Sequence, residues 1–311
     1  MNPKIKKITA TVLAVIFLVG ILPYSLTKIF RTGYKKQGLQ VRVAMLNGRV
    51  KNIPLEEYLI GVVAAEMPAE FEIEALKAQA VAARTYVLKR MGDKTENIFD
   101  VDTTEKTQAW SSNRELSRKW GLVNYFNYHR KIVKAVEETE GKIITYNGQK
   151  IDAVYHSSSG RKGTERASDV WRAETGYLIN VPSGEETPLR FVKHQIFDVN
   201  TFYKLLGFST LPSQFKENDL IVIDRTKGGR VKTLAIRDQV FLGTDVRAKL
   251  QLPSTDFEWK IHNKKIEFII YGKGHGVGMS QYGANDLAKA GQTYSQILAH
   301  FYPDTKLEKV Y

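Results

Sequence analysis

The stretch Pro54 to Gly92, PLEEYLIGVVAAEMPAEFEIEALKAQAVAARTYVLKRMG, decides the fold because it has the pattern of two helices with a sharp break between them. Apolar residues recur at helical spacing, and Pro54 suits a first helical position. Pro68 disfavours the α conformation of the residue before it, so the first helix should end at Glu66. The second helix should span about Glu72 to Met91 and stop at the glycine that follows. Its many alanines would allow close packing.

The position of Glu66 at the end of the first helix suggests a chemical role. A carboxylate there faces the negative end of the helix dipole, and the apolar neighbours Val63, Met67 and Phe71 penalise its charged form. Both effects should raise its pKa, and a carboxyl group that stays protonated near neutral pH can act as a general acid. The alternative is a solvated surface glutamate, which is the usual state of a glutamate near a helix end.

The rest of the chain predicts an α+β fold. Alternating apolar and polar residues flank the turn pairs Asn47-Gly48, Asn147-Gly148, Gly228-Gly229 and Asn263-Lys264, which predicts a series of β-hairpins. No repeat, low-complexity tract or Pro/Ser-rich linker interrupts the pattern. We therefore expect a single intertwined catalytic domain of β-hairpins and the helical pair over residues 41–311.

The N-terminal region has the pattern of a membrane anchor. Residues 1–7 form a basic head, and residues 8–27 carry no charge over about 20 positions, enough for one helix to cross a bilayer. A cleaved signal peptide is the alternative, but no small-x-small cleavage site ends the apolar run. We expect a cytoplasmic head, a single transmembrane helix, and a polar, basic stalk over 28–40. The protein would then lie in the cell membrane. The lysines before the span favour a catalytic domain outside the cytoplasm, the basic residues after the span weaken this charge bias, and the orientation rests partly on the family resemblance given below.

The composition restricts the chemistry. The 311 residues carry a formal net charge of +13, which favours an anionic partner. There is no cysteine, so disulfides and thiolate metal sites or nucleophiles are excluded. The phosphate-loop ending Gly-Lys-Ser/Thr and a GxGxxG motif at the start of a βαβ unit are missing, so we expect no nucleotide or nucleic-acid ligand. No HExxH spacing predicts a zinc site either.

Two further motifs carry polar side chains suited to sugars. One is YHSSSG over 155–160, and the other is GHGVGMSQYGA over 274–284, whose alternate glycines let a polymer approach the backbone closely. A tight strand-to-helix turn in which His275 only caps is the alternative for the second motif. A serine hydrolase is disfavoured because neither motif has a GxSxG elbow. The candidate substrate-binding residues are Tyr155, Ser157, Ser158, Ser159, His275, Ser280, Gln281 and Tyr282.

The three motifs together resemble the signatures of the stage II sporulation protein D family, the peptidoglycan lytic transglycosylases used in engulfment during endospore formation. The resemblance implies cleavage of the N-acetylmuramic acid–N-acetylglucosamine bond in peptide-stripped glycan strands, with Glu66 as the catalytic residue and no cofactor. Some relatives carry zinc-ligating cysteines that this chain lacks, so no metal site is carried over. The implied partners are a membrane-anchored amidase and a polytopic membrane protein of the engulfment machinery, at the septal or engulfing membrane of the mother cell.

A lytic transglycosylase can work with one carboxylate, whereas glycoside hydrolases generally need two. In N-acetylmuramic acid the C6 hydroxyl can attack the anomeric carbon and close a 1,6-anhydro ring, so water need not be activated. Glu66 would protonate the leaving oxygen and then accept the proton of that hydroxyl. A non-catalytic glycan-binding scaffold and a hydrolytic muramidase remain the alternatives.

Overall fold

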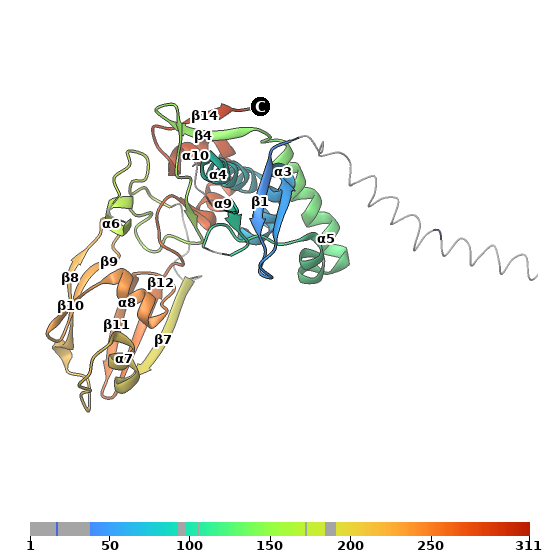
Figure 1. Cartoon of the computed structure of the whole chain (residues 1–311). Coiled ribbons are helices and arrows are strands. Elements are labelled where there is room, and N and C mark those ends of the chain that lie inside the picture. The colour runs from blue at the N-terminus through green and yellow to red at the C-terminus, as the bar shows by residue number, and fades with distance from the viewer. Residues whose placement is uncertain (1–16, 18–37, 93–97, 105, 172, 184–190) are drawn as a thin grey trace, which may run out of the picture.

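The computed structural model describes residues 17, 38–92, 98–104, 106–171, 173–183 and 191–311 and has a mixed α+β architecture (Figure 1). Its helices are α3 (Leu55–Glu66), α4 (Ile73–Gly92), α5 (Asn113–Glu137), α6 (Ala167–Trp171), α7 (Val199–Leu206), α8 (Gly243–Leu250), α9 (Gln281–Lys289), α10 (Tyr294–Phe301) and the 3-10 turn η3 (Glu217–Asp219). The predicted α+β class is confirmed.

The strands form small sheets rather than one large one. Their orders are β2 (Val50–Pro54)-β1 (Gln40–Ala44)-β3 (Val101–Asp102), β10 (Gln239–Leu242)-β9 (Val231–Ile236)-β8 (Leu220–Arg225), β11 (Asp256–His262)-β12 (Lys265–Tyr271)-β7 (Val192–Asp198), β13 (Met279–Ser280)-β6 (Tyr155–His156), and β14 (Lys306–Lys309)-β4 (Lys142–Tyr146)-β5 (Gln149–Lys150).

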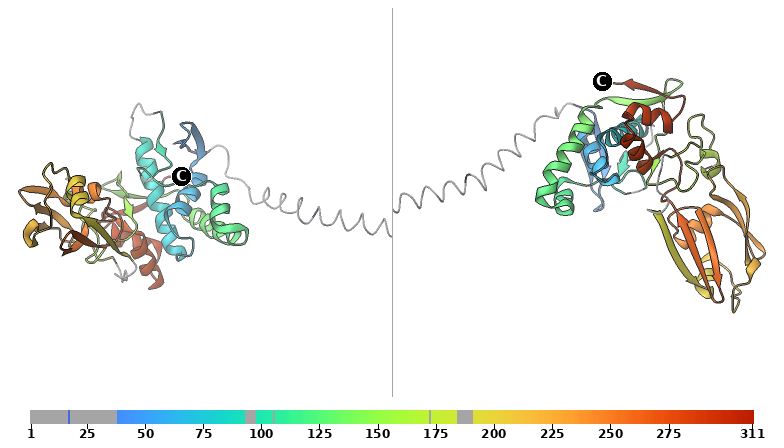
Figure 2. Two further views of the ribbon diagram at one scale, coloured as in Figure 1. Left: turned by 90° about the horizontal axis from the view of Figure 1, so that it is seen from below. Right: turned by 180° about the vertical axis from the view of Figure 1, so that it is seen from behind.

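The helical pair forms as the sequence predicts. Helix α3 begins directly after Pro54 and ends at Glu66, because Met67, which precedes a proline, is extended. Helix α4 spans Ile73–Gly92, and its alanines are buried where α3, α5, α9 and α10 pack around it (Figures 1 and 2). Small side chains on α4 thus allow four helices to pack against one central helix.

The predicted hairpins form, but the loops at Asn47-Gly48 and Gly228-Gly229 are longer than two residues. At Asn147-Gly148 both residues have positive φ, and Tyr146 pairs with Gln149, as a two-residue turn requires. At Asn47-Gly48 the last paired residues are Ala44 and Val50, so the loop has five residues, and Gly48 alone adopts positive φ. The prediction of a two-residue turn there was wrong, because the N–H of Met45 bonds the carbonyl of Arg49 inside the loop.

The buried hydrophobic residues form two cores, a division that the sequence pattern does not reveal. The first core combines residues from 41–178 with residues from 277–302, and includes α3, α4 and α10. The second lies entirely within 199–270, where α7 and α8 cover the β-strands. Figure 1 shows this second region, β7 to β12, set to one side of the helices of the first. The chain therefore leaves the first core before β7 and returns to it after β12.

A buried ion pair fixes α3 against α4. Arg84 is fully buried and donates to both carboxylate oxygens of Glu56, at 2.8 and 2.5 Å. The hydroxyl of Tyr311 also donates to Glu56, which ties the C-terminal residue to the first turn of α3. Glu56 is therefore buried, although its place on the first turn of a helix suggests an exposed side chain.

The predicted head, anchor and stalk lie outside the described residues, apart from Phe17 and residues 38–40. Within the described ranges, no helix has both the length and the hydropathy that a membrane span requires.

Candidate functional site

Glu66 lies at the point where α3 stops and is half-buried. One carboxyl oxygen, Oε1, accepts a hydrogen bond of 2.7 Å from the backbone N–H of Ala109. A backbone donor has no rotamer freedom of its own, so this bond orients the carboxyl group. The other oxygen, Oε2, lies 3.5 Å from Nε2 of Gln281, the first residue of α9. The catalytic candidate and the third motif therefore meet directly.

A second glutamine supports this contact. Gln79 of α4 is completely buried, and its Oε1 lies 3.5 Å from the same Nε2 of Gln281. Gln281 is itself only 4% exposed, so its amide is confined between Glu66 and Gln79. The Nε2 of Gln79 is buried and has no hydrogen-bond partner among the described residues. The site thus includes an unused amide donor close to the carboxylate.

Tyr155 brings the second motif to the same place. Burial, followed by the nearby Glu66 carboxylate, raises the pKa of the Tyr155 hydroxyl well above its ordinary value, so the group stays protonated. The ring is partly exposed but the hydroxyl oxygen is buried; its contact with the Gln108 side chain falls short of normal hydrogen-bond geometry, and no other described residue forms a hydrogen bond with it. A protonated and poorly paired hydroxyl next to a carboxyl group can donate a hydrogen bond to a ligand that reaches it.

The parallel pairing of β6 with β13 is what joins the two motifs. Tyr155 pairs with Met279, and His156 pairs with Ser280. Successive residues of a strand point to opposite sides, so Tyr155 faces Glu66 while His156 faces away from it. Gly278 makes the close approach possible: its φ is +71°, and a Cβ there would lie 2.1 Å from the carbonyl oxygen of Val154.

On the other side of β6, two histidines and a serine form a separate cluster. Nδ1 of His156 lies 3.1 Å from the carbonyl of Val277, so this nitrogen carries the proton. Nε2 of His156 must then accept the hydrogen bond of 2.8 Å from the Ser159 hydroxyl. Burial lowers the pKa of His156 well below its ordinary value and lowers that of His275 to about 4. Both rings are neutral near pH 7 and cannot serve as acids there.

Arg230 holds this cluster together from the second core. Its guanidinium is buried and donates to the carbonyls of Gly274 at 2.8 Å and of Ser159 at 2.6 Å. Nε of Arg230 lies 3.7 Å from a carboxyl oxygen of Glu165. Gly276 leaves room for the guanidinium, because a Cβ there would lie 2.6 Å from its carbon Cζ. The loops of the second and third motifs are thus fixed by one arginine.

The predicted site residues therefore separate into two groups. Tyr155 and Gln281 lie with Glu66, and Tyr282 packs edge-on between Phe71 and Phe191 at 4.8 and 4.5 Å beside them. The other group is structural in its contacts: Ser280 caps α9, the Ser157 carbonyl accepts from the N–H of Tyr282, Ser158 exchanges backbone hydrogen bonds with Lys273, and Ser159 and His275 lie with His156 on the other side of β6.

Several residues of the site gave no sequence signal or only a faint one. Gln79 is a polar residue on the buried, alanine-rich face of α4, and that contrast could have identified it. Ala109 contributes only its backbone N–H, which no residue type can signal. Arg230 follows a Gly-Gly turn in a β-rich stretch and looks like an ordinary exposed arginine in the sequence. Among the described residues, no three His, Asp or Glu side chains are placed to hold a metal ion.

Known proteins resemble this chain over most of its length. A family model described as "Stage II sporulation protein" matches residues 47–146, which include α3 and α4. The chain is 40% identical over 269 residues to Stage II sporulation protein D of Bacillus subtilis (strain 168), covering 85% of this chain and 77% of that protein. The protein of the same name from Bacillus amyloliquefaciens is 40% identical over 264 residues, or 82% and 74% of the two chains. The Amidase enhancer of Bacillus subtilis (strain 168) is 30% identical over 301 residues, or 80% of this chain and 40% of that protein.

Proposed function

The chain belongs to the stage II sporulation protein D family, and from that premise we propose that it is a lytic transglycosylase acting on peptidoglycan during engulfment. The bond cleaved joins N-acetylmuramic acid to N-acetylglucosamine in peptide-stripped glycan strands. The observation that carries the proposal is the Glu66 carboxyl group, oriented by the backbone N–H of Ala109 and adjoined by Gln281 and the Tyr155 hydroxyl.

The proposed reaction transfers protons through one carboxyl group. Protonated Glu66 gives its proton to the glycosidic oxygen while the bond from that oxygen to C1 of the muramic acid breaks. The C6 hydroxyl of the same sugar forms a bond to C1, and Glu66, now a carboxylate, accepts the hydroxyl proton. The Tyr155 hydroxyl and the Gln281 amide are placed to hydrogen-bond the sugar as charge develops. Protons balance, and Glu66 returns to its starting state.

The neighbouring glutamates are less suited to this role. Glu56 is committed to the buried ion pair with Arg84. Glu74 accepts from Lys77 and from the backbone N–H of Tyr294. Glu57 and Glu72 are exposed to solvent. A hydrolytic muramidase would need a second carboxylate beside Glu66 to activate water, which makes hydrolysis the weaker alternative.

We extend the proposal to anchoring and partners. The uncharged segment 8–27 would be a single transmembrane helix that holds the catalytic part outside the cytoplasm. One relative is named an amidase enhancer, which supports an amidase as a partner of this chain. An amidase removes stem peptides and so would supply the stripped strands. The polytopic membrane protein of the engulfment machinery rests on the family alone.

The test is Glu66→Gln, which keeps the size of the side chain and removes the titratable proton. Turnover of peptide-free glycan strands should fall by at least the ~10²–10⁴ typical of a lost general acid and base, with strand binding retained. Glu57→Gln, an exposed substitution on the same helix, is the matched control and should keep full activity. Full activity of Glu66→Gln would refute the proposed mechanism. A wild-type protein that binds strands but never cleaves them would identify a glycan-binding scaffold.

A further inference from the structure

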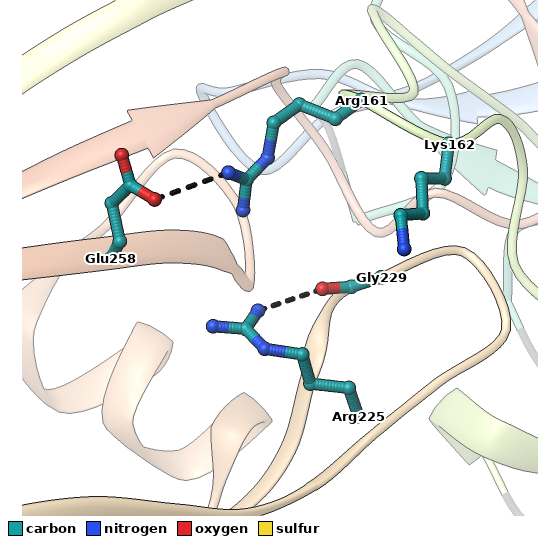
Figure 3. A pocket seen from close by; sticks show the side chains of 5 residues that line it. All are labelled: Arg161, Lys162, Arg225, Gly229 and Glu258. Atoms are coloured by element: carbon teal, nitrogen blue, oxygen red, sulfur yellow. Dashed lines mark hydrogen bonds and ion pairs between the residues drawn. The ribbon is translucent and has the colours of Figure 1, made fainter.

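A cationic pocket lies away from Glu66, where the second motif meets the second core (Figure 3). Its volume is about 290 Å³, and it is lined by Arg161, Lys162, Arg225, Gly229 and Glu258. The first two residues directly follow the YHSSSG motif, whereas the others come from β8, β11 and the turn after β8. A volume near 300 Å³ is at the small end of ligand pockets and suits one sugar unit rather than a long segment.

The three cations of the pocket are not equivalent. Arg161 is neutralised, because it binds the buried carboxylate of Asp256 at 2.6 Å and Glu258 at 3.2 Å. Among the described residues, Arg225 donates to the backbone carbonyls of Gly229 and Phe257. Figure 3 shows the Arg161, Lys162 and Arg225 side chains converging on one space.

The charges of Lys162 and Arg225 are therefore available to a ligand. Within the described ranges, neither has a carboxylate at ion-pair distance. The stem of Lys162 crosses directly over Gly229, where an added Cβ would come within 3.1 Å of it, so the ammonium group is directed along the pocket wall.

The balance of charges indicates a monoanion. Arg161, Lys162 and Arg225 contribute three positive charges, and Asp256 with Glu258 contributes two negative ones, which leaves an excess of one. Glu258 would repel the second charge of a phosphate monoester, but it can accept hydrogen bonds from the hydroxyl or amide groups of a ligand. A sugar that carries one carboxylate together with hydroxyl and acetamido groups meets both requirements.

We propose that this pocket binds the lactyl carboxylate of an N-acetylmuramic acid residue in the glycan strand, with Lys162 and Arg225 as its cationic partners. The proposal rests on the proposed function for its substrate. A muramic acid that still carries a stem peptide has an amide in place of this carboxylate, so the pocket would favour stripped strands. Arg230 connects the two sites, because it follows Gly229 and donates to the Ser159 and Gly274 carbonyls of the two motifs.

The test measures binding of peptide-free strands to the full chain carrying Glu66→Gln, so that no cleavage intervenes. The same strands with their lactyl carboxyl groups converted to amides are the comparison. Amidation should weaken binding by about tenfold, as expected for one lost charge-assisted contact. The double substitution Lys162→Gln with Arg225→Gln should abolish the preference. Lys227→Gln changes an exposed lysine in the same turn that does not line the pocket, and should leave the preference intact.

Three results would overturn the inference: no preference in the parent protein, an undiminished preference in the double variant, or stronger competition by poly(glycerol phosphate) than by peptide-free strands. If the double variant does not fold, Lys162→Gln alone decides, because this exposed side chain has no described polar partner to lose, and it should still reduce the preference. Binding and cleavage fail separately. If the Glu66→Gln protein prefers strands with free carboxylates but the wild type releases no anhydro product, the pocket assignment stands and the transglycosylase proposal fails. If the wild type releases anhydro product but the preference is missing, the transglycosylase proposal stands and the pocket assignment fails.

Discussion

Replacing Tyr155 with phenylalanine removes one buried oxygen beside Glu66 and leaves the ring in place. The Tyr155 hydroxyl is buried, and its contact with the Gln108 side chain falls short of normal hydrogen-bond geometry, so the group is poorly paired in the folded state. A buried polar group left unpaired costs about 1–3 kcal/mol. Tyr155→Phe should therefore raise the free energy of unfolding by about that amount. In a chain of this size each kcal/mol raises Tm by about 2–4 °C.

The same substitution should lower activity, because the hydroxyl is proposed to bind the sugar. A hydrogen bond to a group that develops charge contributes about 1.5–3 kcal/mol, which corresponds to roughly a 10- to 100-fold loss of turnover. The assays are urea denaturation and turnover of peptide-free strands on the same preparations. Tyr203→Phe is the control. Its hydroxyl donates to the Asp219 carboxylate at 2.9 Å in the second core, so its loss should cost about 1.5–3 kcal/mol of stability and leave turnover within twofold.

Opposite changes in stability and activity are the signature of a polar group reserved for substrate. A Tyr155→Phe variant that is less stable than the parent would mean that the hydroxyl is satisfied in the folded protein. A variant that is more stable and fully active would mean that the hydroxyl has no part in binding. Either result would mean that the Tyr155 hydroxyl is not a substrate-binding group.

Three further predictions concern stability and the product. Glu56→Gln leaves the Arg84 charge buried without its partner and should lower the free energy of unfolding, measured in urea, by about 3–5 kcal/mol. Adding Arg84→Met should recover most of this stability. A loss below about 1 kcal/mol in the single variant would contradict the prediction. Burial raises the pKa of Glu165 from 4.5 to about 7, so between those values the folded state keeps a proton that the unfolded chain has lost. Stability should therefore fall as pH rises through that window, by about 1.4 kcal/mol per pH unit and about 3 kcal/mol in all, and Glu165→Gln should flatten the slope; an unchanged slope would assign it to other groups. Cleavage should leave a 1,6-anhydro end on the muramic acid, and mass analysis of the products should detect it; a reducing end would indicate hydrolysis.

Local signals predicted most of the elements around the site. Pro54, Pro68 and Gly92 defined the helical pair to within a residue or two, because proline and glycine act on the backbone directly. The Asn147-Gly148 turn was equally informative, since its type requires positive φ at both residues. These signals depend on neighbours in the chain, and so they can be read without the fold.

The arrangement of the site depended on contacts between distant segments, and these were not predictable. The β6–β13 pairing decides that Tyr155 faces Glu66 while His156 faces away, and nothing within either motif specifies that pairing. Gln79 and Gln281 are 202 positions apart, and their contact follows from the packing of α9 on α4. The second core escaped prediction for a related reason, because its hairpins look in sequence like those of the first.

Mass analysis of the products that wild-type protein releases from peptide-free glycan strands in ¹⁸O-labelled water distinguishes transglycosylation from hydrolysis. The proposed mechanism should yield fragments that end in 1,6-anhydromuramic acid and contain no label, since the C6 hydroxyl closes the ring in place of water. Glu66→Gln should release none of them, and Glu57→Gln should release them as the parent does. Reducing ends that carry ¹⁸O would identify a hydrolase with a second carboxylate, and would contradict the transglycosylase mechanism even if Glu66→Gln were inactive.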